Sequence, residues 1–126
     1  MKLHFLILFI FGIAVSSCMA QTGGNFSQAN NKEFAEKMQN ANNVVLDVRT
    51  PSEYGSGHLE NATMIDVTQA DFEQKIKALD KNKTYLVYCR SGARSSTACS
   101  IMVKNGFKNV VNLTNGISAW DGKVVK

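Results

Sequence analysis

The chain has 126 residues and a formal net charge of +4, and its length suits one compact domain rather than several. Its lysines and arginines are scattered among acidic residues and do not cluster with aromatic ones, which argues against a nucleic-acid-binding surface. Three cysteines are too few for a disulfide scaffold, and no Cys-x-x-C or Cys/His ligand spacing predicts a metal site or a bound cofactor.

The first residues are typical of an export signal, because Lys2 precedes an apolar run that ends in small residues. Two processing routes stay open: Cys18 as the lipidated first residue of a bacterial lipoprotein, or cleavage before Gln21. An uncleaved membrane anchor is a third route. We expect an exported protein, either periplasmic or anchored to a membrane as a lipoprotein. The expected organisation is a signal peptide over residues 1–20, a polar tether over 21–29 and a folded domain over 30–126.

Beyond this segment, short apolar runs alternate with stretches of helical periodicity. In chain order we expect a helix over 31–39, a strand over 44–48, a capped helix start at 50–53, a strand over 62–67, a helix over 71–79, a strand over 85–88, a helix over 95–104, a strand over 110–113 and a short helix over 116–120. This alternation predicts the α/β class, with a small parallel sheet and helices on both faces.

Cys89 lies between the predicted strand 85–88 and the predicted helix 95–104. The loop that joins them contains a glycine and two cationic side chains: Arg90, Ser91, Gly92, Ala93 and Arg94. The N–H groups of such a loop and of the helix start favour negative charge, and cationic neighbours favour the thiolate form of a cysteine. We therefore predict that Cys89 is a nucleophile, that residues 90–94 bind an anionic substrate, and that Arg94 contacts the anion. Arg90 either steers the substrate or faces solvent.

Asp47 and Arg49 lie at the end of the strand 44–48. Because functional loops of parallel sheets lie at the carboxyl ends of strands, this pair shares a rim with Cys89. The pair either orients the active loop through hydrogen bonds or forms an internal salt bridge that braces the rim, and we favour the salt bridge. His58 is expected to tie loops together and Trp120 to close the core. Cys99 is expected to lie in the core or at its edge, and the alternative is that its thiol resolves a sulfur species on Cys89.

In order and spacing, these motifs resemble those of the single-domain rhodaneses, which are sulfurtransferases. The resembling segments are DVR at 47–49, EY at 53–54, GHL at 57–59, ATMI at 62–65, YCRSGARS at 88–95, GF at 106–107, VVNL at 110–113, GI at 116–117 and Trp120. Asn61 and Asn115 stand where the family usually has glycine. Asparagine tolerates the left-handed backbone, so we expect both turns to be kept.

The resemblance implies that Cys89 takes a sulfane sulfur from thiosulfate or a persulfide and becomes a persulfide itself. It then passes the sulfur to cyanide, a thiol or a protein acceptor. The alternative is a sulfur-carrier or protein-binding module with little turnover of its own. Related cysteine phosphatases and arsenate reductases carry Cys-x5-Arg, whereas Cys89 and Arg94 form Cys-x4-Arg, so the resemblance favours sulfur over oxyanion chemistry.

Overall fold

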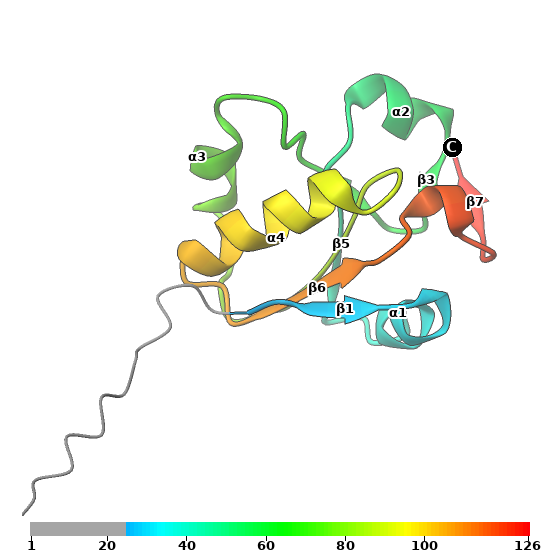
Figure 1. Cartoon of the computed structure of the whole chain (residues 1–126), viewed down its shortest axis with the longest axis horizontal. Helices are drawn as coiled ribbons and strands as arrows, with labels where there is room; N and C mark the ends of the chain where they lie inside the picture. Colours follow the sequence, from blue (N-terminus) through cyan, green and yellow to red (C-terminus); the bar gives the residue numbers. More distant parts are fainter. Residues whose placement is uncertain (1–24) are drawn as a thin grey trace, which may run out of the picture.

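Five parallel strands form the central sheet of the protein, whose computed structural model describes residues 25–126 (Figure 1). In spatial order the strands are β1 (Ser27–Ala29), β6 (Asn109–Leu113), β5 (Thr84–Tyr88), β2 (Val44–Asp47) and β4 (Thr63–Met64). The inner strands are rich in Val and Leu, as expected for a parallel sheet covered on both faces. The predicted α/β class with a parallel sheet is confirmed.

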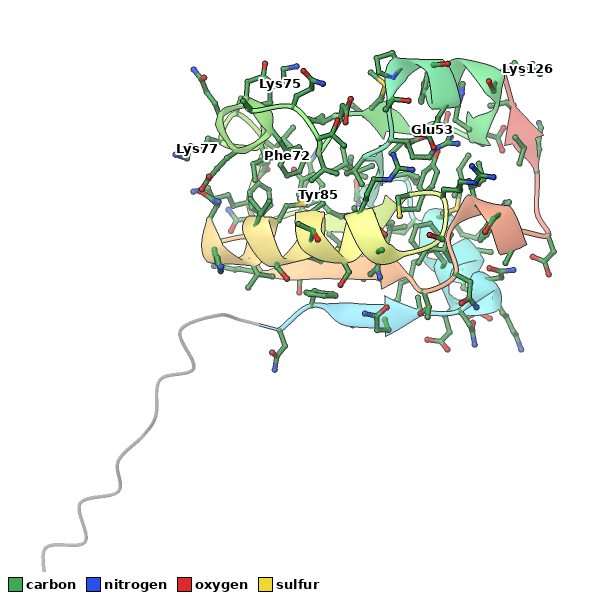
Figure 2. All side chains as sticks on the ribbon, turned by 45° about the horizontal axis from the view of Figure 1, so that its top comes forward. Glu53, Phe72, Lys75, Lys77, Tyr85 and Lys126 are labelled. Atoms are coloured by element: carbon green, nitrogen blue, oxygen red, sulfur yellow. The ribbon has the colours of Figure 1, made fainter. Side chains whose placement is uncertain are left out.

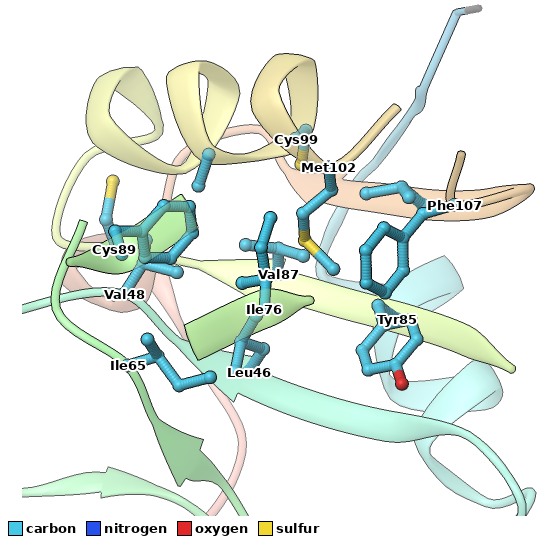
Figure 3. Packing of buried hydrophobic residues seen from close by; sticks show 13 residues of the cluster. Leu46, Val48, Ile65, Ile76, Tyr85, Val87, Cys89, Cys99, Met102 and Phe107 are labelled. Carbon is cyan, nitrogen blue, oxygen red and sulfur yellow. The ribbon is translucent and has the colours of Figure 1, made fainter. Parts of the chain in front are cut away.

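Helices cover both faces of this sheet. They are α1 (Asn31–Met38), α2 (Pro51–Ser56), α3 (Phe72–Ile76), α4 (Ala93–Lys104) and the 3-10 helix η1 (Ile117–Ala119). On one face, Val87 joins a core with residues of α3 and α4, including Ile76 and Met102 (Figure 3). On the other face, Leu86 joins a second core with Phe34 of α1. Successive residues of a strand point to opposite faces, so β5 contributes to both cores.

The first strand lies in a segment that its polar composition predicts to be a tether. Residues 27–29 form β1, which pairs with β6 in parallel register. Ser27 and Gln28 are exposed and only Ala29 is buried, so no alternation of apolar and polar residues marks this strand. Its position depends on backbone hydrogen bonds to a strand more than eighty residues away in the sequence.

A second, antiparallel ribbon pairs β3 (His58–Leu59) with β7 (Val124–Val125), and neither strand is among the predicted elements. β4 is likewise only two residues long, within the predicted strand 62–67. Strands of two residues are too short to show a period of two, so only the tertiary pairing reveals their limits. The helix α3 is also shorter than predicted, and α4 begins two residues earlier.

Helix α2 begins as the sequence predicts. Its N-cap residue, Thr50, accepts a hydrogen bond from the backbone N–H of Glu53 at 3.3 Å, and Pro51 is the first helical residue. The Thr50 hydroxyl in turn donates to the Glu53 carboxylate at 3.1 Å. This cap fixes the position of the Glu53 side chain, which matters for the site described below.

The predicted signal peptide, Cys18 and residues 21–24 of the predicted tether lie outside the described residues. Within residues 25–126, no helix combines the length and the apolar character that crossing a membrane requires. Export and lipidation therefore stay predictions from the sequence.

Candidate active site

The loop after β5 holds Cys89 at the carboxyl rim of the sheet. β2 and β5 end side by side, and Asp47 pairs in register with the last residue of β5. Cys89 follows directly, and only 1% of its surface is exposed. Its carbonyl accepts a hydrogen bond from the N–H of Ile117 at 2.9 Å, and the Arg90 carbonyl accepts one from the N–H of Ser118 at 3.0 Å. These two hydrogen bonds hold the Cys89 loop against the start of η1.

Two glycines permit the close packing of this loop against the segment that follows β6. Gly116 has a φ of 65°, and a Cβ at this position would lie 2.3 Å from the carbonyl oxygen of Arg90. Gly92 has a φ of 102°, and its Cβ would lie 2.1 Å from the carbonyl oxygen of Thr114. Both the backbone conformation and the available space therefore require glycine.

Several hydrogen-bond donors converge on the Cys89 thiol. The N–H of Gly92 donates to Sγ at 3.1 Å, and the Ser95 hydroxyl lies 3.2 Å from the same atom. Burial raises the pKa of the Cys89 thiol, but hydrogen bonds from the Ser95 side chain and from the backbone at Ser91, Gly92 and Ser95 outweigh burial and lower the pKa below its ordinary value. A lowered pKa increases the fraction of thiolate, the nucleophilic form.

Cys99 is as buried as Cys89, but the pKa of its thiol is shifted in the opposite direction. It is fully buried on α4, and burial together with the nearby Cys89 charge raises the pKa of its thiol to about 12. Figure 3 shows Cys99 on α4 and Cys89 apart from it, in the loop that precedes this helix. Both are free thiols. The predicted core position of Cys99 is confirmed.

Arg94 is paired with a carboxylate that the sequence pattern assigns only to a helix cap. Its guanidinium donates to both Glu53 oxygens, at 2.8 and 2.9 Å, and the two side chains are about a third exposed. Figure 2 labels Glu53 on α2, above the loop that leads into α4. The Arg94 hydrogen bond, supported by Thr50, lowers the pKa of Glu53 to about 2. Glu53 is therefore an anion at neutral pH and is bound to Arg94, the side chain that the sequence predicts to contact the substrate anion.

A depression of about 300 Å³ lies beside the Cys89 loop, at Arg90, and we call it the mouth of the site. It is lined by Arg49, Glu53, Ser56, Arg90, Ile117 and Ser118. Among the predicted loop residues, Arg90, Ser91 and Ala93 are exposed, Arg94 is half-buried and Gly92 is buried. Of the two loop arginines, Arg94 has a carboxylate partner, so Arg90 is the one that offers a free guanidinium to an incoming anion.

Asp47 and Arg49 form the internal ion pair that the sequence favours. The Arg49 guanidinium lies 2.7 Å from the Asp47 carboxylate, and both side chains are buried. The same carboxylate accepts the Tyr88 hydroxyl at 2.6 Å, and Arg49 also donates to the Gly57 carbonyl at 2.7 Å. These contacts connect β2, β5 and the end of α2, so the pair braces the rim.

Two other predicted structural residues occupy connecting positions. His58 Nδ1 lies 2.9 Å from the Tyr54 carbonyl oxygen, and the two rings stack with centroids 3.7 Å apart. His58 therefore ties β3 to α2, as expected. The Trp120 ring packs edge-on against Phe34 with centroids 5.9 Å apart, which joins η1 to α1.

The chemistry available here is that of a thiol nucleophile held among hydrogen-bond donors. The donors around Sγ can hold negative charge on a thiolate or on a further sulfur atom bonded to it. In the described part of the chain, no three His, Cys, Asp or Glu side chains gather as metal ligands would. Besides Glu53, sequence reasoning missed Ser95 as a donor to the thiol, although it stands within the quoted motif at 88–95.

Comparison with known proteins agrees with this geometry. Residues 30–123 match the rhodanese-like domain family. A sulfurtransferase from Allochromatium vinosum is 30% identical over 95 residues, which cover 75% of this chain and 87% of that protein. The chain belongs to the rhodanese-like family.

The rhodanese fold is shared with solved structures and with relatives of different names. A rhodanese-related protein from Thermoplasma volcanium superposes with a TM-score of 0.71 at 30% identity, over 79% of this chain and 98% of that one. YrkF of Bacillus subtilis, named as a putative sulfur carrier protein, is 32% identical over 91 residues, which cover 71% of this chain and 48% of that protein. The family and its sulfurtransferase relatives support sulfur transfer as the general activity.

The two departures from the usual rhodanese glycines have different outcomes. Asn61 has a φ of 62° and so adopts the left-handed backbone as predicted. It is the only non-glycine residue with positive φ among residues 25–126, so Asn115 keeps an ordinary conformation. The turn before η1 instead uses the positive φ of Gly116. A glycine at position 115 is therefore not needed for this turn.

Proposed function

We propose that this protein is a sulfurtransferase that carries sulfur as a persulfide on Cys89. The observation that supports it best is the set of donors around Sγ, because the Gly92 N–H and the Ser95 hydroxyl lie 3.1 and 3.2 Å away and lower the pKa of the thiol. Thiosulfate or a persulfide is the donor, and cyanide, a small thiol or a protein thiol is the acceptor.

In the first step, the Cys89 thiolate attacks the outer sulfur of thiosulfate. A new S–S bond forms to Cys89 while the bond between the two thiosulfate sulfurs breaks, and sulfite leaves with the electron pair of that bond. Arg90 attracts the dianion to the mouth, and the loop N–H groups receive the terminal sulfur, which carries the negative charge of the new persulfide.

In the second step, the acceptor attacks the terminal sulfur of the persulfide. Cyanide forms a C–S bond and leaves as thiocyanate, or a thiolate forms a new persulfide. In either case the Cys89 S–S bond breaks and its electron pair returns to Cys89 as the thiolate. No net charge or proton is gained by the enzyme over the cycle, and no other group needs to be oxidised or reduced.

A sulfur-carrier function is the second candidate, supported by the similarity to YrkF. A carrier would load at Cys89 in the same way but would turn over cyanide poorly and deliver its sulfur to a partner protein. The ratio of loading rate to turnover rate separates the two. Loading that is much faster than turnover with every small acceptor favours the carrier.

The deciding experiment is the intact mass of the protein after incubation with thiosulfate and then with cyanide. We expect a gain of one sulfur atom that cyanide removes with release of thiocyanate. Cys89→Ser should abolish the gain. The matched control, Cys99→Ala, should retain most of it, because the pKa of the Cys99 thiol is raised to about 12 and that thiol is buried. A gain that survives in Cys89→Ser, or is lost in Cys99→Ala, would contradict the single-cysteine scheme.

We further propose that the protein is exported and lipidated at Cys18. The arrangement of Lys2, the apolar run and the small residues before Cys18 supports this. Metabolic labelling with a radioactive fatty acid should label the wild-type chain and leave Cys18→Ala unlabelled. Label in neither chain, with a mature N-terminus at Gln21, would favour a soluble exported form instead.

A further inference from the structure

Asn112 is a buried polar residue that connects β1 to the Cys89 loop. It lies on β6 with only 2% of its surface exposed. Its amide nitrogen donates to the Gln28 side-chain oxygen at 3.0 Å and to the Gly92 carbonyl at 3.4 Å. Its own amide oxygen is buried and has no hydrogen-bond partner. A buried polar atom without a partner lowers stability, so an apolar residue would suit this place in the sheet better for folding alone.

The Gly92 carbonyl is the point at which Asn112 reaches the site. Three donors approach this oxygen: the Ser96 N–H at 3.1 Å, the Ser95 hydroxyl at 3.1 Å and the Asn112 amide at 3.4 Å. A carbonyl oxygen has two lone pairs, and the Ser96 N–H takes one as the first bond of α4. The Ser95 hydroxyl and the Asn112 amide therefore compete for the second.

The Ser95 hydroxyl also has two possible acceptors for its proton. It carries one proton and lies 3.1 Å from the Gly92 carbonyl oxygen and 3.2 Å from Cys89 Sγ. It can donate to only one of them at a time. When the Ser95 hydroxyl donates to the Gly92 carbonyl, the Cys89 thiolate loses one of its hydrogen-bond donors. When the hydroxyl donates to Sγ, Asn112 is the donor that satisfies the second lone pair of the carbonyl.

We propose that Asn112 is a positioning residue for sulfur transfer, which occupies the Gly92 carbonyl and so leaves the Ser95 proton for the Cys89 sulfur. It touches no reacting atom and acts through Gly92 and Ser95. This inference concerns the same site as the proposed function and rests on it for its biological meaning. The predicted effect on the Cys89 thiol can be measured without any sulfur donor or acceptor.

The test measures the rate at which iodoacetamide alkylates Cys89 as a function of pH, with Cys99→Ala as the background. Asn112→Leu removes the amide donor and keeps a similar volume. We expect its alkylation near pH 7 to be about threefold slower, with the midpoint of the pH profile moved upward, because a donor to a charged sulfur is weakened. Ser95→Ala should slow the reaction more, by about tenfold. The other groups that interact with the Cys89 charge are Arg94 and the Cys99 thiol, and Asn112→Leu alters neither.

Thr114→Val is the matched control. Thr114 follows the end of β6, and its hydroxyl lies 3.2 Å from the same Gln28 oxygen that Asn112 contacts. Its side chain makes no hydrogen bond to the Gly92 carbonyl or to the sulfur. The alkylation profile of Thr114→Val should therefore match that of the background chain.

The combination of Asn112→Leu with Ser95→Ala decides the mechanism. Because Asn112 acts through the Ser95 proton, its removal should have no further effect on the pH profile once Ser95 is alanine. Effects of the two variants that multiply, or a wild-type profile in Asn112→Leu, would overturn the proposal. If Asn112→Leu fails to fold, Asn112→Ala carries the same test. If neither thiosulfate nor a persulfide donor loads Cys89, the proposed function is contradicted, whereas this inference about the reactivity of the thiol is judged by the alkylation profiles alone.

Discussion

At the scale of single residues, the charge balance at the mouth of the site depends on Glu53. Its carboxylate is paired with Arg94, and the Arg49 guanidinium is paired with Asp47, so among the charged side chains at the mouth Arg90 is left without an ion-pair partner within residues 25–126. Glu53, in the first turn of α2, thus lowers the positive charge with which the site attracts an anion. The pKa of Glu53 is lowered to about 2, mainly by the Arg94 hydrogen bond, so this carboxylate stays charged at any pH at which the enzyme would work.

Neutralising Glu53 should therefore improve the use of an anionic donor. We expect Glu53→Gln to lower the KM for thiosulfate about threefold at low ionic strength, because the dianion meets one more net positive charge. Arg94→Ala should raise the KM by at least a similar factor, since it leaves Glu53 as an unpaired anion at the mouth. Steady-state thiosulfate–cyanide kinetics measure both effects, which should be constant between about pH 5 and pH 8.

The opposite signs of these two changes are the informative result. Both variants remove the same ion pair, so a purely structural role in holding α2 to α4 would impair both in the same direction. Added salt should shrink both differences, because it screens charges at a half-exposed site. If Glu53→Gln and Arg94→Ala raise the KM equally at every ionic strength, the pair acts by docking the two helices and not by its charge.

At the scale of elements, the loop between β5 and α4 is set by the segment that follows β6. The Gly92 backbone lies against the Thr114 carbonyl, and the Gly116 backbone lies against the Arg90 carbonyl. The Ile117 N–H donates to the Cys89 carbonyl as well. The donors that face Sγ are therefore positioned by contacts between segments more than twenty residues apart, and they do not result from the loop sequence alone.

A methyl group at Gly92 should disrupt this contact. We expect Gly92→Ala to lower the free energy of unfolding by about 3 kcal/mol and to slow Cys89 alkylation, because a positive φ and a steric overlap with backbone add together. Gly55→Ala is the control, since beyond its chain neighbours and the backbone of its own helix no atom of the described chain lies within 4 Å of the point that its new methyl group would occupy, and its φ is not positive. It should change stability by less than about 1 kcal/mol, toward greater stability. Urea unfolding gives both values, and equal stability of the two variants would contradict the packing described.

At the scale of the whole molecule, the two ends of the described chain close the fold. β1 extends the sheet beyond β6, and Phe26 packs against one core while Ala29 enters the other. At the opposite end, β7 pairs with β3, next to Gly57, whose carbonyl receives Arg49. Both terminal strands thus support residues of the rim, although they are distant from Cys89 in sequence.

A charge placed in β1 tests whether this strand belongs to the domain. Ala29→Asp should lower the free energy of unfolding by about 3 kcal/mol, because it puts a carboxylate among buried apolar side chains of the second core. Ser27→Asp, on the exposed side of the same strand, should be close to neutral. Thermal unfolding monitored by circular dichroism compares them. If neither variant changes the thermal stability, residues 27–29 behave as part of the tether and not of the folded domain.

Much of the fold and of the site could be predicted because the signals are local. The central strands are continuous apolar runs, the α2 cap is a four-residue pattern, and the loop at 89–94 contains its own glycine and cations. Asp47 and Arg49 could be placed at the rim because parallel strands end at a common edge. The internal ion pair, the tie made by His58 and the core position of Cys99 follow from residue type and neighbours.

The α/β class and the family could be predicted from the amino-acid sequence, and so could the position of Cys89 in the loop between β5 and α4. Three other features became visible only in the folded chain: Glu53 covers Arg94, Asn112 reaches the Gly92 carbonyl, and β1 and β7 complete the two sheets. The physical reason is distance along the chain. The period of a strand, a helix cap and a loop are encoded by residues that are adjacent in the sequence. An ion pair, or a carbonyl oxygen that accepts from two side chains, forms only when folding brings together groups that no local sequence pattern connects.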